Sequence, residues 1–238
     1  MSFLAAIIDP EAGATLAADT IVTDPATRNV MGFDWKLDEG PAPRCVLGFT
    51  GAGALMGNLL LEMPEHVDDL DALLNILPAA FQRAHAGTTA GFTEADARCN
   101  VVVAGWSLQA GRYRGFSITS YRKKTIRPGE FREPWSLNEI EPGTIYLNTE
   151  IDAADIEQCG YPPAEDEIDE HTLTRLVCAA RQFSPKSGTN IGGNITLARV
   201  GAEGVDLRIM HEWPEDVIGH PVDPSRGAVL PDYLTDAT

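Results

Sequence analysis

The sequence predicts an α+β fold, a four-layer αββα sandwich in which two antiparallel sheets are flanked by helices. Three observations support this prediction. Short apolar runs joined by Pro and Gly turns open the chain, helical patterns follow them, and further hairpin patterns occupy the middle and the end. Strands that are consecutive in sequence and joined by short turns pair in the antiparallel direction.

Strands dominate the first fifty residues. FLAAIID (3–9) is a short apolar run closed by a turn with Pro10 and Gly13, and ATLAADTIVT (14–23) follows at once. This pattern indicates a β-hairpin. RCVLGFT (44–50), bounded by a proline and a glycine, is a further compact strand.

Two helices are expected next. In residues 51–63 the apolar side chains recur about every four positions, which predicts an amphipathic helix that ends at the following proline. A second helix should begin near Asp68 or Asp69, whose carboxylates suit a helix N-terminus, and continue through residues 70–86. Pro78 predicts a kink or a break within it.

The remaining elements are strands, a loop-rich stretch, a helix and a final hairpin. Residues 99–108 and 112–121 are β-rich and are separated by a turn, whereas residues 122–166 lack a clear pattern. An acidic first turn and an apolar stripe predict a helix from about 165 to 182. A hairpin is expected over residues 194–213.

The chain is interpreted as a single domain. No repeat and no linker divides residues 1–213, and residues 214–238 form a Pro- and Asp-rich tail. The apolar stretch at the N-terminus ends at Asp9, which is too short for the core of a signal peptide or for a membrane span. We therefore expect a cytoplasmic protein.

The net charge excludes some partners. With 35 acidic and 18 basic residues the formal charge is −17, so nucleic acid and anionic membranes would be repelled. A basic stretch from Arg112 to Arg132 departs from this pattern. We interpret it as a solvated strand pair and loop, with a docking surface as the alternative.

Cysteine and histidine spacing gives no indication of a metal site. The four cysteines are widely separated, no C-x-x-C occurs, and the histidines lack ligand spacing. We expect neither metal nor disulfide framework, and interpret two of the cysteines as buried thiols in apolar runs. The cysteines are Cys45, Cys99, Cys159 and Cys178.

A glycine run after the expected strand at 44–50 offers an alternative function. Gly51, Gly53 and Gly57 superficially match a dinucleotide-binding turn between a strand and a helix. That site needs a second parallel strand after the helix, and the sequence predicts another helix instead. Close packing of strand and helix is the preferred role of these glycines.

The N-terminus carries groups suited to nucleophilic catalysis. A hydrolase that uses its own first residue needs a hydroxyl or thiol, a base, a cation and a donor for the oxyanion. After removal of Met1, Ser2 would have a free α-amine, whose ordinary pKa is about 7.7 to 8.0 and which can act as a base. One residue would then supply both nucleophile and base.

The order and spacing of further residues resemble the proteasome β subunits and the peptidase subunit of the bacterial ATP-dependent two-component protease. Those N-terminal-nucleophile (Ntn) hydrolases begin with a nucleophilic Thr on a strand and return through an A-x-D-x-x-x-T-like motif. Ser2, Asp19 and Thr23 stand at the matching positions in SFLAAIID and LAADTIVT. Lys36 in FDWKL matches the family lysine of the next strand, and Gly48 in LGFTGAG matches the glycine at a strand end whose amide forms the oxyanion hole.

The resemblance implies a role for each of these residues. Ser2 would attack an amide carbonyl, Lys36 would stabilise the deprotonated nucleophile, and Asp19 would hold Lys36 and the amine in place. The Gly48 amide would bind the oxyanion, and Thr23 would contact the backbone of a bound peptide. The resemblance further implies the Ntn hydrolase fold, hydrolysis of peptides or proteins without a cofactor, a homo-oligomer such as a ring, and an ATP-dependent unfoldase as partner.

The second half of the chain departs from the family pattern. The G-S-G-like turn before the third family helix is missing, and in SPKSG Ser187 and Gly188 match the family Ser-Gly, whereas Ser184 stands where the family has Asp. An attached Met1 would also convert the Ser2 amine into an amide, which is not a base. A catalytically inactive ring-forming or scaffold subunit with the same fold is therefore the alternative.

Overall fold

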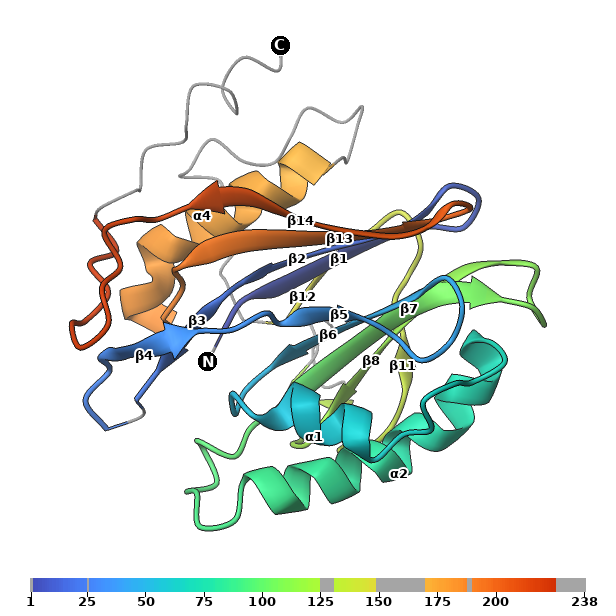
Figure 1. The fold of residues 1–238 in the computed structure, drawn as a ribbon, viewed down its shortest axis with the longest axis horizontal. Helices are drawn as coiled ribbons and strands as arrows, with labels where there is room; N and C mark the ends of the chain where they lie inside the picture. Colours follow the sequence, from blue (N-terminus) through green and yellow to red (C-terminus); the bar gives the residue numbers. More distant parts are fainter. Residues whose placement is uncertain (1, 25, 125–130, 149–169, 188–189, 226–238) are drawn as a thin grey trace.

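The computed structural model describes residues 2–24, 26–124, 131–148, 170–187 and 190–225 (Figure 1). Strands pair in the antiparallel direction throughout this part of the chain, and helices pack beside the sheets. The predicted α+β class with antiparallel sheets is confirmed.

The first sheet contains both ends of the domain sequence. Its strand order is β12-β1-β2-β13-β14, so the N-terminal hairpin lies between a late strand and the final hairpin. The β1–β2 turn ends at Gly13, which has a φ of 140° and approaches Val200 so closely that a Cβ would lie 2.1 Å from its carbonyl oxygen. The strands are β1 (Leu4–Asp9), β2 (Gly13–Asp19), β12 (Ile145–Leu147), β13 (Asn194–Gly201) and β14 (Gly204–Glu212).

The second sheet has the order β11-β8-β7-β6-β5. Two-stranded sheets form from β3 with β4 and from β9 with β10. The strands of the second sheet are β5 (Leu37–Glu39), β6 (Cys45–Thr50), β7 (Asn100–Ser107), β8 (Arg112–Thr119) and β11 (Asn138–Glu139). The short pairs are β3 (Ile21–Thr23), β4 (Val30–Phe33), β9 (Lys123–Lys124) and β10 (Phe131–Arg132).

The expected helices form, and of the kink or break predicted at Pro78 the break does not occur. They are α1 (Leu55–Leu61), α2 (Leu70–Thr88) and α4 (Glu170–Ser187). Asp69 caps α2 by accepting a hydrogen bond from the Ala72 amide at 2.7 Å. Pro78 does not break α2, because the helix continues through it with a buried apolar stripe on both sides of the proline. Packing outweighs the hydrogen bond that proline removes.

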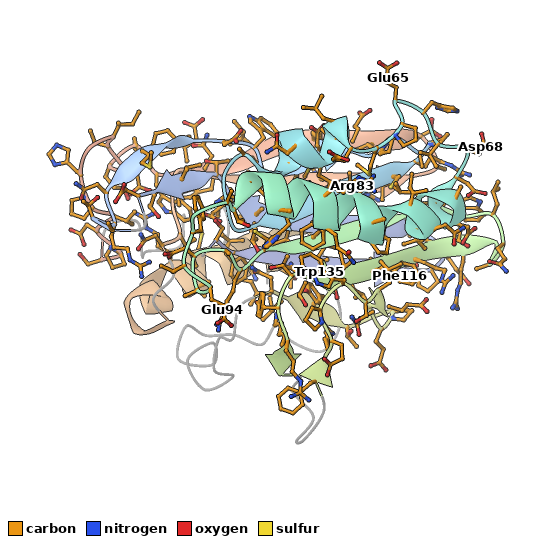
Figure 2. The ribbon with its side chains drawn as sticks, turned by 90° about the horizontal axis from the view of Figure 1, so that it is seen from below. Glu65, Asp68, Arg83, Glu94, Phe116 and Trp135 are labelled. Carbon is orange, nitrogen blue, oxygen red and sulfur yellow. The ribbon has the colours of Figure 1, made fainter. Side chains whose placement is uncertain are left out.

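Three apolar clusters connect these elements. One lies between α1, α2 and the second sheet, one joins the facing sides of the two sheets, and one lies between α4 and the first sheet (Figure 1). Leu4, Leu16 and Val46 belong to the cluster between the sheets. Trp135, labelled in Figure 2, packs edge-on against Phe81 of α2 with ring centroids 5.3 Å apart.

The expected strand at 14–23 is divided into two. β2 ends at Asp19, and β3 pairs with β4 in a separate small sheet. The Thr20 amide points to the carbonyls of Gly192 and Asn194 at 3.3 and 3.0 Å, and the Thr20 carbonyl accepts from the Asp34 amide at 2.7 Å. These bonds turn the chain out of the first sheet between β2 and β3.

The described part of the loop-rich stretch contains four short strands, β9 to β12, that were not predicted. β12 pairs with β1 in the register Ala5↔Leu147. This register places Asn148, the residue that follows β12, beside the N-terminal residues. The helix expected at 165–182 ends later, at Ser187, and residues 149–169 of this stretch lie outside the described residues.

Residues 214–225 of the expected tail include ordered contacts. Asp216 is buried, and Pro221 forms a β-bridge with Asn29. The boundary at residue 213 stays a prediction. None of the helices in the described ranges is both long and apolar enough to cross a membrane.

The basic stretch is partly paired. Arg114 donates two hydrogen bonds of 2.8 Å to Glu139, and Arg122 donates one of 3.0 Å to Glu133. Residues 125–130 of the stretch lie outside the described residues. Lys123 of the same stretch is buried and donates to the Asn148 carbonyl at 2.6 Å, so the interpretation as a solvated strand pair stays a prediction.

Candidate active site

Asp19 connects the three positions that sequence analysis placed in one site. Its side chain is fully buried at the end of β2. Oδ1 accepts a hydrogen bond from the Phe3 amide at 2.9 Å, and Oδ2 lies 2.9 Å from Lys36 Nζ. The Gly192 amide also donates to Oδ2, at 3.4 Å. The backbone next to Ser2 and the ammonium of Lys36 therefore share one carboxylate.

Lys36 is held by the edge of the second sheet. It directly precedes β5, rather than lying within a strand as expected, and its carbonyl accepts from the Phe49 amide at 2.9 Å. This bond extends the β5–β6 ladder by one residue and directs the chain past the end of β2. Its side chain is 4% exposed.

The buried ammonium of Lys36 has N–H donors that form no hydrogen bond within the described residues. Nζ forms the ion pair with Asp19, but no acceptor in the described part of the chain meets hydrogen-bond geometry with it. Burial lowers the pKa of Lys36, while the charges of Asp19 and Asp34 oppose that shift. A cation in such a dry site interacts strongly with an anion that forms beside it.

Ser2 lies at the head of β1 and is buried. Its carbonyl accepts a hydrogen bond from Asn148 Nδ2 at 2.9 Å, and the same nitrogen donates to Thr50 Oγ1 at 2.9 Å. Asn148 Oδ1 accepts from the Leu4 amide. Sequence analysis missed Asn148, because its only signal is the short β-rich run TIYLN within a stretch of turns.

Gly48 does not lie at a strand end. It is the fourth of six residues in β6, between Leu37 of β5 and Val102 of β7. A Cβ at this position would lie 2.5 Å from Leu4 Cδ1, so the glycine permits close contact between the two sheets. Because the Phe49 amide points to β5, alternation along the strand directs the Gly48 amide to β7.

Gly51 follows the end of β6 and has a φ of 125°, a conformation that favours glycine. It lies two residues beyond Phe49, whose amide bonds the Lys36 carbonyl. Because it lies outside the β6–β7 ladder, Gly51 is a second candidate for presenting an amide to the site.

Thr23 and Ser187 are the two remaining residues that the sequence predicted for the site. Thr23 ends β3, is half-buried and pairs with Val30. A Cβ at Gly53 would lie 3.4 Å from Val22 Cγ1, so β3 lies beside the loop that follows β6. Ser184 and Ser187 lie in the last turn of α4; their side chains and the following Gly188 lie outside what the structure describes.

A second buried ion pair, which sequence analysis missed, stabilises a turn next to Asp19. The buried guanidinium of Arg181 donates to both oxygens of Asp216, at 2.8 and 2.7 Å. Asp216 Oδ2 also accepts from the Gly193 amide at 2.7 Å. The pair therefore fixes the turn whose Gly192 amide reaches Asp19.

Comparisons with known proteins identify the fold through structure alone. No family model and no curated protein matches the chain. An Anbu (Gly-1) mutant from Hyphomicrobium sp. strain MC1 is similar with a TM-score of 0.60 and 17% identity, over 91% of this chain and 89% of that one. Anbu (ancestral beta-subunit) from Yersinia bercovieri gives a TM-score of 0.57 and 12% identity, over 90% and 88%.

A further solved structure, Anbu from Hyphomicrobium sp. strain MC1, gives a TM-score of 0.55 with 17% identity, over 90% of this chain and 88% of the other. At such low identity these likenesses show the fold, which extends over most of both chains. They do not assign an activity.

Proposed function

We propose that the chain is a proteasome-like Ntn hydrolase that cleaves amide bonds in peptides or proteins with Ser2 after removal of Met1. The observation that carries this proposal is the shared carboxylate of Asp19, which holds the Phe3 amide and the buried Lys36 ammonium at 2.9 Å each. The likeness to Anbu structures adds support at the level of the fold.

The proposed reaction uses both functional groups of Ser2. Its α-amine accepts the hydroxyl proton while the oxygen attacks the substrate carbonyl, and a tetrahedral oxyanion forms. The C–N bond then breaks, the amine proton passes to the leaving group, and an ester on Ser2 remains. Water, deprotonated by the same amine, hydrolyses this ester and releases the acid. No cofactor takes part.

Lys36 and Asp19 act on the nucleophile by charge and by position. The Lys36 ammonium stabilises the developing alkoxide because few other partners compete for it. Asp19 keeps the ammonium beside the head of β1. We propose that the oxyanion is bound by the Gly51 amide in place of that of Gly48, because the Gly48 amide is directed into the sheet.

Other parts of the proposal concern binding and assembly. Thr23, on β3 beside the loop after β6, would contact the backbone of a bound peptide, and Ser187 would join the hydrogen bonds of the nucleophile. We further propose the complete four-layer αββα sandwich of the Ntn hydrolases, with residues 1–213 as one domain. A cytoplasmic homo-oligomer such as a ring, served by an ATP-dependent unfoldase, completes the proposal.

One sequence feature favours a second function. Ser184 replaces the family Asp in SPKSG, so an inactive scaffold subunit with the same fold is the competing hypothesis. The two hypotheses differ in what they predict for Ser2 once its amine is free.

Peptide turnover by matched samples tests the proposal. The chain is prepared with Met1 and, after treatment with methionine aminopeptidase, without it, and a library of fluorogenic peptides is supplied. We expect turnover only without Met1, and its loss in Ser2→Ala but not in Ser225→Ala, an exposed serine. Equal turnover in Ser2→Ala, or none by the processed wild type, would contradict the proposal.

A further inference from the structure

The two residues before β1, Ser2 and Phe3, lie beyond the ladders on both edges of that strand. On one edge the last paired residue is Leu4, opposite Ala18 of β2, and on the other it is Ala5, opposite Leu147 of β12. Ser2 and Phe3 therefore have no strand partner, although both are buried. Buried backbone groups need hydrogen-bond partners from elsewhere.

Asn148 supplies those partners on the β12 edge. Its backbone amide donates to the Leu4 carbonyl at 3.0 Å, as the next residue of a strand would. Its side chain continues in the same direction, because Oδ1 accepts from the Leu4 amide and Nδ2 donates to the Ser2 carbonyl. The side-chain amide thus takes the place of a peptide unit that β12 does not provide.

Asp19 does the same on the β2 edge, where Oδ1 accepts from the Phe3 amide. Backbone groups of successive residues in a strand point to opposite edges. Asn148 bonds the Ser2 carbonyl and the Leu4 amide and carbonyl on one edge. Asp19 bonds the Phe3 amide on the other edge. Because hydrogen bonds hold both edges, the start of β1 cannot rotate freely about the strand axis.

The orientation of the Asn148 amide is itself determined by its surroundings. Nδ2 also donates to Thr50 Oγ1 of the second sheet, and the Asn148 carbonyl accepts from Lys123 Nζ at 2.6 Å. A flipped amide would direct its oxygen at the Ser2 carbonyl and its nitrogen at the Leu4 amide, which are both repulsive. The side chain is therefore a rigid support.

We propose that Asn148 is a positioning residue for the nucleophile, a role that rests on the proposed function of Ser2. By fixing the Ser2 carbonyl and the Leu4 amide it sets the directions of the Ser2 amine and hydroxyl relative to Lys36. Displacement of a reacting group by about 1 Å can cost about 100-fold in rate. The effect should fall on kcat, because Asn148 is buried and its side chain is bonded to Ser2, Leu4 and Thr50.

Two nearly isosteric variants test this role. Asn148→Asp keeps the acceptor for the Leu4 amide but replaces the donor to the Ser2 carbonyl with a negatively charged oxygen. We expect kcat to fall by about tenfold or more while KM stays within about threefold. The acid limb of the pH–rate profile should move to higher pH, because a nearby anion raises the pKa of the Ser2 amine.

Thr50→Val is the matched control, because it removes the second acceptor of Nδ2 and leaves the bond to Ser2. Its kcat should stay within about threefold of wild type. Unchanged kcat and an unmoved acid limb in Asn148→Asp would overturn the proposal. An equal loss in Thr50→Val would do so as well, since the polar cluster and not the grip on Ser2 would then matter.

Hydrogen exchange separates this inference from the proposed function. In Asn148→Ala the Leu4 amide loses its acceptor and should exchange at least about tenfold faster than in wild type. Unchanged protection of that amide would overturn the positioning role, whether or not the protein turns over. A processed wild type without turnover would instead refute the proposed function, and the Leu4 exchange rate would still decide the role of Asn148.

Discussion

The carboxylate of Asp19 lies 2.9 Å from the Lys36 ammonium, and both side chains are almost completely buried. This ion pair joins the end of β2 to the edge of the second sheet. Because the other carboxylate oxygen holds the Phe3 amide, the pair also fixes the distance between the cation and the head of β1. The catalytic proposal depends on this arrangement, and so do the pH effects expected from it.

The alkaline limb of the pH–rate profile should reflect Lys36. Catalysis requires Lys36 to be charged, and burial lowers its pKa from the ordinary value of about 10.4. Activity is therefore lost as the pH rises through this lowered pKa. We expect kcat/KM of the processed chain to decline below pH 10.4, whereas a decline only above it would contradict the role of Lys36.

Asp19→Asn should move the alkaline limb of the pH–rate profile to a lower pH. The charge of Asp19 raises the pKa of Lys36, so its removal leaves burial less opposed. We expect lower activity and an alkaline limb at lower pH than in wild type. Asp38→Asn is the control, because Asp38 lies on neighbouring β5 but does not contribute to the shift. A limb that stays in place in Asp19→Asn would show that another group titrates.

Asp216→Ala should strongly destabilise the fold. It leaves the buried Arg181 guanidinium without its carboxylate, and breaking a buried pair in this way costs about 3–5 kcal/mol. Urea denaturation measures the loss. Asp206→Ala, which removes a more exposed pair with Arg208, should change stability by about 0.5 kcal/mol or less. Similar losses in the two variants would mean that the Arg181 pair contributes no more than a surface contact.

Gly48→Ala tests whether this glycine serves packing. The new Cβ would lie 2.5 Å from Leu4 Cδ1 and 3.0 Å from Leu37 Cδ2, and such overpacking costs about 1–3 kcal/mol. Gly57→Ala is the matched control, since no atom lies within 4 Å and the residue is in a helix. It should stabilise the protein by about 0.5–1 kcal/mol. A neutral Gly48→Ala with lost activity would favour the original role as oxyanion donor.

The thiols of Cys45, Cys99 and Cys178 should not react in the native protein. Burial raises their pKa values to about 12, 11 and 12, so almost no thiolate exists at pH 8. Iodoacetamide followed by peptide mapping should find these residues alkylated only after unfolding. Rapid native labelling of any of them would contradict the burial seen here.

Local patterns were sufficient to predict much of the fold. The turns at Pro10 and Gly13 indicated the first hairpin, and the spacing of apolar residues indicated α1 and α2. The order Ser2, Asp19, Lys36 was also informative, because adjacent strands and a short connection bring these positions together.

Contacts between distant segments could not be predicted in this way. Asn148 meets Leu4 across 144 positions, and Arg181 meets Asp216 across 35, from segments whose local sequence resembles a loop and a tail. Gly48 shows a different limit, since a glycine that permits close packing and one that exposes its amide look the same in sequence. Only the register of β6 with its neighbours distinguishes them.

Intact-mass analysis of labelled protein tests the central claim most directly. The chain with and without Met1 is treated with a hydroxyl-reactive electrophile, and the modified residue is located by peptide mapping. We predict one adduct on Ser2 of the processed chain, none on the chain that keeps Met1, and none in Ser2→Ala. A processed chain whose Ser2 stays unlabelled, or an adduct that persists in Ser2→Ala, would contradict the account.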